Sequence, residues 1–153
     1  MSDQARIKGH TVTRTVHIDA SRARVWKALT DPDVMVKWFG DAVGFTALAA
    51  GATGSIDWDD YGSFPIEITE VVPDGSFGFR WSGIPAEQLD EYSTHVRFTL
   101  ADAGTGTDVT VIESGFDTLP GGTRYRRERL DQHREGWDVE LDELALLFAG
   151  VAE

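Results

Sequence analysis

The chain has 153 residues, of which 41% are hydrophobic and 10% aromatic, enough to build the core of one ordinary domain. A formal net charge of −12 argues against nucleic acid and anionic membrane surfaces as partners. The absence of cysteine excludes disulfides, thiolate nucleophiles and thiolate metal sites. Since the sequence contains no signal-peptide-like start and no apolar stretch long enough to span a membrane, we expect a cytoplasmic protein. We expect one domain over residues 1–153, with its core at about 11–148.

The N-terminal region predicts a strand followed by two short helices. Valine and isoleucine lie among threonines in Thr11–Ile18, a composition typical of a strand. Ser21 stands at the N-cap position of a helix that ends before Pro32, because proline disfavours a helical conformation in the residue that precedes it. Asp31 can cap a second helix, with Pro32 at its first position and Gly40 after its end.

The middle of the chain is a run of short segments in which apolar and polar residues alternate. This alternation is typical of antiparallel strands with one face buried and one exposed. Pro73-Asp74-Gly75 predicts a turn, in which the proline presets φ and the glycine accepts a positive φ. Residues 102–106 predict a hairpin loop. The predicted strands lie at about 54–58, 64–68, 77–81, 96–100 and 107–113.

The last predicted element is a long helix from about Leu130 to Phe148. Its apolar positions recur every three or four residues and so share one face: Leu130, His133, Trp137, Leu141, Leu144 and Phe148. A single amphipathic helix cannot bury its own apolar face, so the strands must receive it. We therefore predict an α+β fold in which a curved antiparallel sheet of about six to seven strands surrounds the C-terminal helix. Such a sheet leaves a space at one end where a ligand could bind.

Three motifs in the chain resemble a known superfamily. Val25–Pro32, Lys37–Phe39 and His133–Trp137 are similar to the START-like, or SRPBCC, superfamily, and within it to the branch named after the activator of the ATPase of heat-shock protein 90. The resemblance extends from about Thr11 to Phe148. It implies a helix-grip fold with a cavity between the sheet and the terminal helix. It indicates fold more strongly than function, because the superfamily includes lipid carriers, polyketide cyclases, allergens, hormone receptors and co-chaperone domains.

Aromatic residues dominate the predicted wall of this cavity. Any single tryptophan could instead be an ordinary core residue, but as a group the indoles favour a cavity lining, since four of them rarely pack without gaps. We expect an edge of Trp81 and of Trp137 to face the cavity. The predicted ligand-binding residues are Trp38, Phe39, Phe45, Trp58, Phe64, Phe79, Trp81, Phe98, Glu113, His133, Trp137 and Leu141.

Two of these residues could move protons. Glu113 ends a strand whose Val109 and Val111 face inward, and its pKa would rise if it were buried without a partner. His133 lies one turn before Trp137 and could donate a proton or anchor the polar end of a ligand. The alternative, which we favour, has His133 hydrogen-bonded locally and partly exposed at the helix entrance.

The sequence contains no recognisable catalytic or metal-binding motif. Its four histidines are scattered, no nucleophile motif surrounds Ser114, and no glycine-rich phosphate loop precedes a helix. We therefore predict no metal and no cofactor. The basic run Arg124–Arg129 could dock an acidic partner or gate the pocket, but we favour a solvated first turn whose charge Glu128 and Asp131 offset.

Three functions compete. We favour binding of a small hydrophobic molecule without defined catalysis, and the second is a polyketide cyclase- or aromatase-like enzyme that uses the same cavity. The third is a co-chaperone-like or regulatory domain with a protein partner, although the presence of one such domain argues against chaperone activation. Exposed edge strands near the N-terminus leave a homodimer open.

Overall fold

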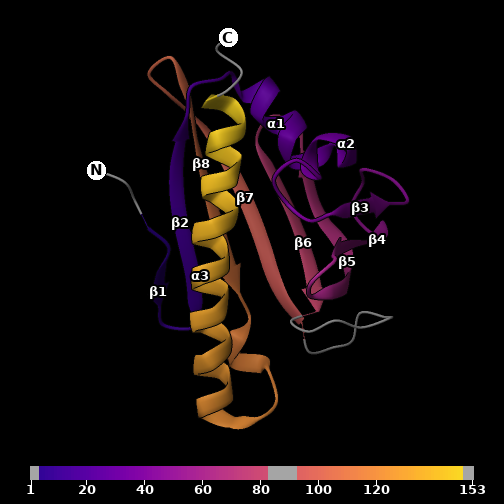
Figure 1. Ribbon diagram of the computed structural model, residues 1–153, viewed down its shortest axis with the longest axis vertical. Coiled ribbons are helices and arrows are strands. Elements are labelled where there is room, and N and C mark those ends of the chain that lie inside the picture. Colours follow the sequence, from indigo (N-terminus) through magenta and orange to yellow (C-terminus); the bar gives the residue numbers. More distant parts are fainter. Residues whose placement is uncertain (1–3, 83–92, 150–153) are drawn as a thin grey trace.

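The computed structural model describes residues 4–82 and 93–149, and an antiparallel sheet of eight strands forms its centre (Figure 1). The order of the strands across the sheet is β1-β2-β8-β7-β6-β5-β4-β3. Their bounds are β1 Arg6–Lys8, β2 Thr11–Ile18, β3 Ala42–Phe45, β4 Thr53–Trp58, β5 Gly62–Val72, β6 Ser76–Ser82, β7 Ser93–Ala103 and β8 Gly106–Ser114.

Three α-helices and one short 3₁₀ turn complete the described chain: α1 Arg22–Thr30, α2 Pro32–Met35, η1 Phe116–Thr118 and α3 Gly122–Ala149. The predicted N-caps are confirmed, but α2 ends at Met35 with Val36 as its C-cap, so the expectation that this helix runs to just before Gly40 is wrong. Ser21 accepts a hydrogen bond from the Arg24 amide at 3.3 Å, and Asp31 accepts one from the Asp33 amide at 3.0 Å. These two caps turn the chain sharply and bring α1 and α2 over one end of the sheet.

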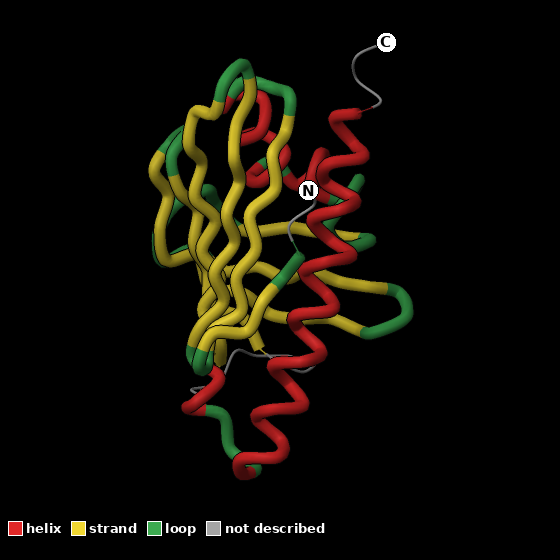
Figure 2. The backbone as a smooth tube through the Cα atoms, turned by 90° about the vertical axis from the view of Figure 1, so that its left-hand side faces the viewer, coloured by secondary structure: helices red, strands yellow, loops and turns green. Residues whose placement is uncertain are grey.

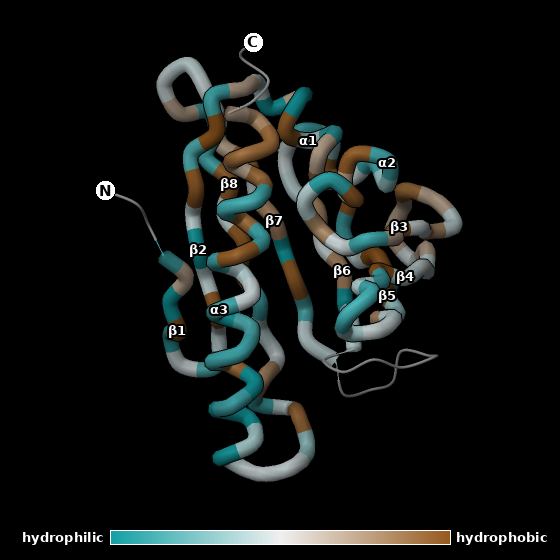
Figure 3. Tube along the Cα trace, in the orientation of Figure 1, coloured by the Kyte–Doolittle hydropathy of each residue, from teal (hydrophilic) through white to brown (hydrophobic). Residues whose placement is uncertain are grey.

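The sheet curves along α3, which confirms the predicted helix-grip fold. Figure 2 shows α3 standing beside the strands, with the strands of one sheet end crossing those of the other end steeply. The strand number is higher than predicted, because β1 and β3 contain only 3 and 4 residues and are too short to show alternation. Helix α3 begins at Gly122 rather than near Leu130. Its first turns are mostly hydrophilic (Figure 3) and lie outside the apolar stripe, so the stripe does not predict them.

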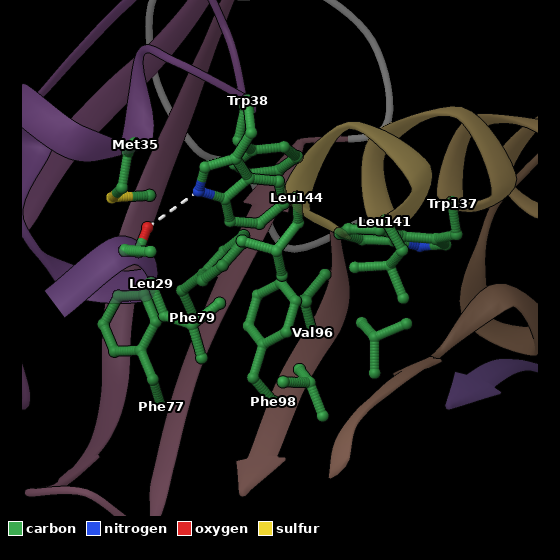
Figure 4. Close-up of a cluster of buried hydrophobic side chains, with 14 of the residues drawn as sticks. Leu29, Met35, Trp38, Phe77, Phe79, Val96, Phe98, Trp137, Leu141 and Leu144 are labelled. Atoms are coloured by element: carbon green, nitrogen blue, oxygen red, sulfur yellow. Dashed lines mark hydrogen bonds between the residues drawn. The ribbon is translucent and has the colours of Figure 1, made fainter. Parts of the chain in front are cut away.

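The end of the sheet below α1 and α2 is filled by a closed core (Figure 4). Trp38 is 4% exposed, and its indole N–H donates to the Ala28 carbonyl at 2.7 Å, so its polar atom is satisfied inside the core. The side chains that pack here come from α1, α2, β6, β7 and α3: Leu29, Met35, Phe77, Phe79, Val96, Phe98, Leu141 and Leu144.

The turn between β5 and β6 differs from the prediction in one detail. The Gly75 amide donates to the Val72 carbonyl at 2.9 Å, as a turn requires, but the residue with positive φ is Asp74, at 60°. Aspartate tolerates this left-handed conformation better than most residues. The expectation that the glycine supplies the positive φ is therefore wrong.

A buried arginine joins α3 to the sheet. Arg14 of β2 is 6% exposed, and its guanidinium donates to the Asp142 carboxylate at 2.7 Å and to the Asp138 carbonyl at 2.9 Å. The Ala5 amide donates to the Asp138 carboxylate at 2.6 Å, so this helix turn also holds the chain just before β1.

Replacing Arg14 with methionine should lower the free energy of unfolding by about 2 kcal/mol, because hydrogen bonds between charged groups at a buried site are lost. Urea denaturation of Arg14→Met would measure the loss. The matched control is Arg124→Met, which breaks the exposed pair Arg124–Glu128 and should cost about 0.5 kcal/mol or less. Equal losses in the two variants would contradict a special role for Arg14.

Candidate functional site

A fully buried carboxylate lies at the contact between α3 and the sheet. Glu113 is 0% exposed and shares the inward face of β8 with Val109 and Val111. Strand register places Glu113 opposite Val96 of β7, while Trp81 of β6 pairs with Thr94 of β7. Three adjacent strands therefore direct polar atoms to one point below the helix.

Four side chains donate hydrogen bonds to Glu113. From the sheet, the Trp81 indole donates at 2.9 Å and the Thr94 hydroxyl at 2.5 Å, both to Oε2. From α3, the Trp137 indole donates to Oε1 at 2.8 Å, and Nδ1 of His133 lies 2.8 and 2.9 Å from the two oxygens. The carboxylate thus joins the helix to the sheet and satisfies both indole N–H groups.

The hydrogen bonds of His133 define its tautomer. Its Nε2 lies 3.1 Å from a terminal nitrogen of Arg129, one helical turn earlier. A guanidinium only donates, so Nε2 accepts and Nδ1 carries the hydrogen that points to Glu113. The interpretation of His133 as locally bonded therefore describes its contact with Arg129 and misses its contact with Glu113.

The pKa of Glu113 moves in the opposite direction to that expected for an unpaired buried acid. Burial raises the pKa, but the interaction with His133 and the hydrogen bonds from His133, Thr94 and Trp81 outweigh burial and hold the pKa below its ordinary value. Glu113 is consequently an ionised structural group that orients His133, rather than a neutral acid.

A pocket of about 640 Å³ opens beside this network, between α3 and strands β4 to β6. Contiguous aromatic rings form its wall: the ring centroids of Trp58 lie 5.3 Å from those of Phe39 and Phe64 and 6.1 Å from that of Trp81. The residues around the pocket are Phe39, Trp58, Tyr61, Phe64, Trp81, Ser82, Arg129, Gln132, His133, Glu135, Gly136, Trp137, Val139 and Glu140.

The predicted cavity residues fall into four groups in the structure. Those that line the pocket are Phe39, Trp58, Phe64, Trp81, His133 and Trp137. Glu113 lies directly behind Trp81, Trp137 and His133. Phe45 lies at a separate hollow of about 790 Å³ near β3, which has no comparable aromatic wall. The remaining four belong to the closed core: Trp38, Phe79, Phe98 and Leu141.

Three charged pocket residues were not among the sequence candidates: Arg129, Glu135 and Glu140. Arg129 lines the pocket instead of lying with the solvated start of the helix, and Glu140 lies one turn beyond Trp137. A signal for both exists in the sequence, since Arg129, His133, Gly136 and Glu140 follow one another at helical spacing beside the apolar stripe. Burial, together with the nearby carboxylates of Glu143 and Asp41, raises the pKa of Glu140 to about 7.

Neither a metal site nor a membrane span is found in the described part of the chain. No three histidine, aspartate or glutamate side chains of residues 4–82 and 93–149 converge as metal ligands. Within the same ranges, no helix combines the length and the apolar character that crossing a membrane would require.

Comparison with protein families gives one match. The model of the family described as "Activator of Hsp90 ATPase homolog 1-like protein" matches residues 19–149, which confirms the resemblance seen in the three motifs. No curated protein matches the sequence.

Solved structures of the same fold span nearly the whole chain. Protein MLL2253 from Mesorhizobium loti is 24% identical, with a TM-score of 0.74 over 90% of this chain and 95% of that one. The Aha1 dimer from Colwellia psychrerythraea is 19% identical, with a TM-score of 0.72 and the same two coverages. DynU16, a protein from the dynemicin biosynthetic locus, is 29% identical with a TM-score of 0.71, over 90% of this chain and 46% of DynU16.

Replacing Glu113 with glutamine should lower the free energy of unfolding by about 3 kcal/mol, because an amide cannot accept from all four donors. The pH dependence should change as well. Since the folded-state pKa of Glu113 lies below the ordinary value of 4.5, its stabilisation is present above pH 4.5 and is lost as the pH falls through the folded pKa. Urea denaturation between pH 7 and pH 3 should show a smaller acid-induced loss in Glu113→Gln than in the wild type.

The control for this prediction is Asp131→Asn, which removes an exposed carboxylate on the same helix and should change stability by less than about 0.5 kcal/mol. A Glu113→Gln variant as stable as Asp131→Asn at pH 7 would show that Glu113 does not hold the helix to the sheet.

Proposed function

We propose that this chain, which belongs to the family of Activator of Hsp90 ATPase homolog 1-like proteins, binds a small hydrophobic ligand in the pocket between α3 and strands β4 to β6. The observation that carries the proposal is the aromatic wall. Trp58 and Phe64 are only partly buried, so their rings offer a surface to a guest, while Trp81 and Trp137 behind them are held in place by Glu113.

The size and composition of the pocket also support the proposal. A volume of about 640 Å³ lies within the range of pockets that hold small organic molecules, roughly 300–1,000 Å³. Such pockets combine apolar walls with a few fixed polar groups, and here His133 and Arg129 are fixed by hydrogen bonds at one end. A guest would therefore meet a preformed surface and would lose little free energy in ordering it.

Titration with the neutral dye N-phenyl-1-naphthylamine tests the proposal. We expect a rise in dye fluorescence with a dissociation constant in the micromolar range, roughly 1–10 μM. Trp58→Ala should weaken binding about tenfold, because it removes a central aromatic contact. Tyr61→Ala, a change at a residue that is 71% exposed, should weaken binding without disturbing the fold.

Val72→Ala is the control, since Val72 is exposed at the far end of β5 and lies outside the pocket. Dye binding that is unaffected by both Trp58→Ala and Tyr61→Ala would place the dye elsewhere and refute the proposal.

The hydrogen-bonded chain of Glu113, His133 and Arg129 favours a second candidate function, that of an enzyme of the polyketide cyclase or aromatase type. His133 lines the pocket with its tautomer held by Glu113, an arrangement that suits proton transfer to or from a bound molecule. The reaction in question would be an intramolecular aldol condensation of a poly-β-ketone chain. Once the substrate displaces Arg129 from Nε2, His133 would take a proton from the carbon between two carbonyl groups, and that carbon would bond to another carbonyl carbon of the chain. The proton would return to the alkoxide that forms, and the hydroxyl would leave as water.

Incubation with a linear poly-β-ketone thioester would test this candidate. We expect cyclised product to form faster than in buffer, and His133→Asn to lower the rate at least about 100-fold while dye binding persists. His17→Asn, at an exposed surface histidine, serves as the control. A rate equal to that in buffer would eliminate the enzyme and leave the binding protein.

A further inference from the structure

The pocket has two differently charged ends. Arg129 and Glu140 both line it, eleven residues apart on α3, which corresponds to about 16 Å along the helix. At the Arg129 end the charges are compensated inside the protein. Arg129 donates to His133 and to Gln132, and His133 donates to the buried carboxylate of Glu113.

At the Glu140 end, no positive group of the described residues compensates the negative charge of the carboxylate. Within residues 4–82 and 93–149, neither a basic side chain nor a hydrogen-bond donor contacts the Glu140 carboxylate. The charged groups whose fields act on it are Glu143 of the same helix and Asp41 of the segment after α2, and both are acidic. Tyr61 approaches the pocket from the turn between β4 and β5.

We propose that the ligand of this pocket is an organic cation, with an ammonium group that lies against Glu140 and an apolar or aromatic body that lies against the aromatic wall. This inference rests on the proposed function and names the chemical class of its ligand. An ammonium group supplies the positive charge that the Glu140 end lacks, and the faces of aromatic rings attract cations.

The charge of the whole chain favours the same ligand class. A net charge of −12 draws cations toward the protein and repels anions at a distance. Glu135 adds a second carboxylate to the pocket lining, so the residues around the opening carry more negative than positive charge. A hydrophobic carboxylate could reach Arg129 only against this field, and Arg129 is already engaged by Gln132 and His133.

Three naphthalene probes of the same size and different charge test the inference at pH 8. They are 2-(1-naphthyl)ethylamine, 2-(1-naphthyl)ethanol and 1-naphthaleneacetate, and isothermal titration calorimetry measures their dissociation constants. We expect the amine to bind about tenfold more tightly than the alcohol, and the carboxylate to bind more weakly than both. In Glu140→Gln, the amine and the alcohol should bind with affinities that agree within about twofold.

Glu143→Gln is the matched control. It removes a neighbouring negative charge from a residue that does not line the pocket, so the preference for the amine should fall by no more than about twofold. An equal loss of preference in both variants would assign the effect to the general field and overturn the contact with Glu140.

Proton release gives an independent readout. Near pH 6.5 part of the Glu140 population is protonated, since its pKa is about 7, and an arriving ammonium group should displace that proton. The heat of amine binding at pH 6.5 should therefore depend on the ionisation enthalpy of the buffer in the wild type and lose this dependence in Glu140→Gln. His133 is unchanged in that variant, so it cannot account for the difference.

The outcomes separate this inference from the proposed function. Equal affinities for the amine and the alcohol, or the tightest binding for the carboxylate, would overturn the organic cation and leave a hydrophobic pocket in place. No binding of any of the three probes or of the neutral dye would overturn both proposals.

Discussion

A carboxylate without solvent contact persists in a protein only where hydrogen-bond donors surround it, and the structure depends on this constraint at Glu113. An unpaired charge at such a position would cost several kcal/mol. Here the donors come from β6, β7 and α3, so the constraint fixes the distance between helix and sheet as well as the charge. Two of these bonds also orient the indoles of Trp81 and Trp137.

This anchoring explains why the two ends of the sheet differ. Below α1 and α2, large apolar residues from five elements fill the hollow, and Trp38 satisfies its indole N–H within that core. Beyond Glu113, the indoles of Trp81 and Trp137 are hydrogen-bonded to the carboxylate, and the pocket opens beside them. The pocket therefore lies beside the polar network, whereas apolar packing closes the other end of the sheet.

The two sides of α3 carry acidic residues with different environments. Asp138 and Asp142 face Arg14 of the sheet and are paired, whereas Glu140 faces the pocket among other carboxylates. The fold is shared with proteins of varied description, so it does not specify a ligand by itself. The pocket of this chain combines an aromatic wall, an oriented histidine and a carboxylate that lacks a counter-charge.

The sequence alone determined the features that depend on short-range patterns. Ser21 and Asp31 cap helices, the period of the strands places Val109, Val111 and Glu113 on an inward face, and the apolar stripe of α3 requires a sheet to cover it. The sequence did not predict the short strands β1 and β3, because three or four residues carry too little alternation. It also did not predict the positive φ at Asp74, because either of two residues in such a turn can adopt it.

Only the tertiary structure decided which inward residues meet. The burial of Glu113 was open to prediction, but its partners lie 19 to 32 residues away, and strand register and helix packing bring them together. For this reason the pKa of Glu113 lies below its ordinary value, whereas the pKa of an unpaired buried acid would lie above it. The same applies to the division of the aromatic residues between core and pocket, and to the isolation of Glu140. A local pattern specifies the face on which a side chain lies, whereas its electrostatic surroundings are set by segments distant in the chain.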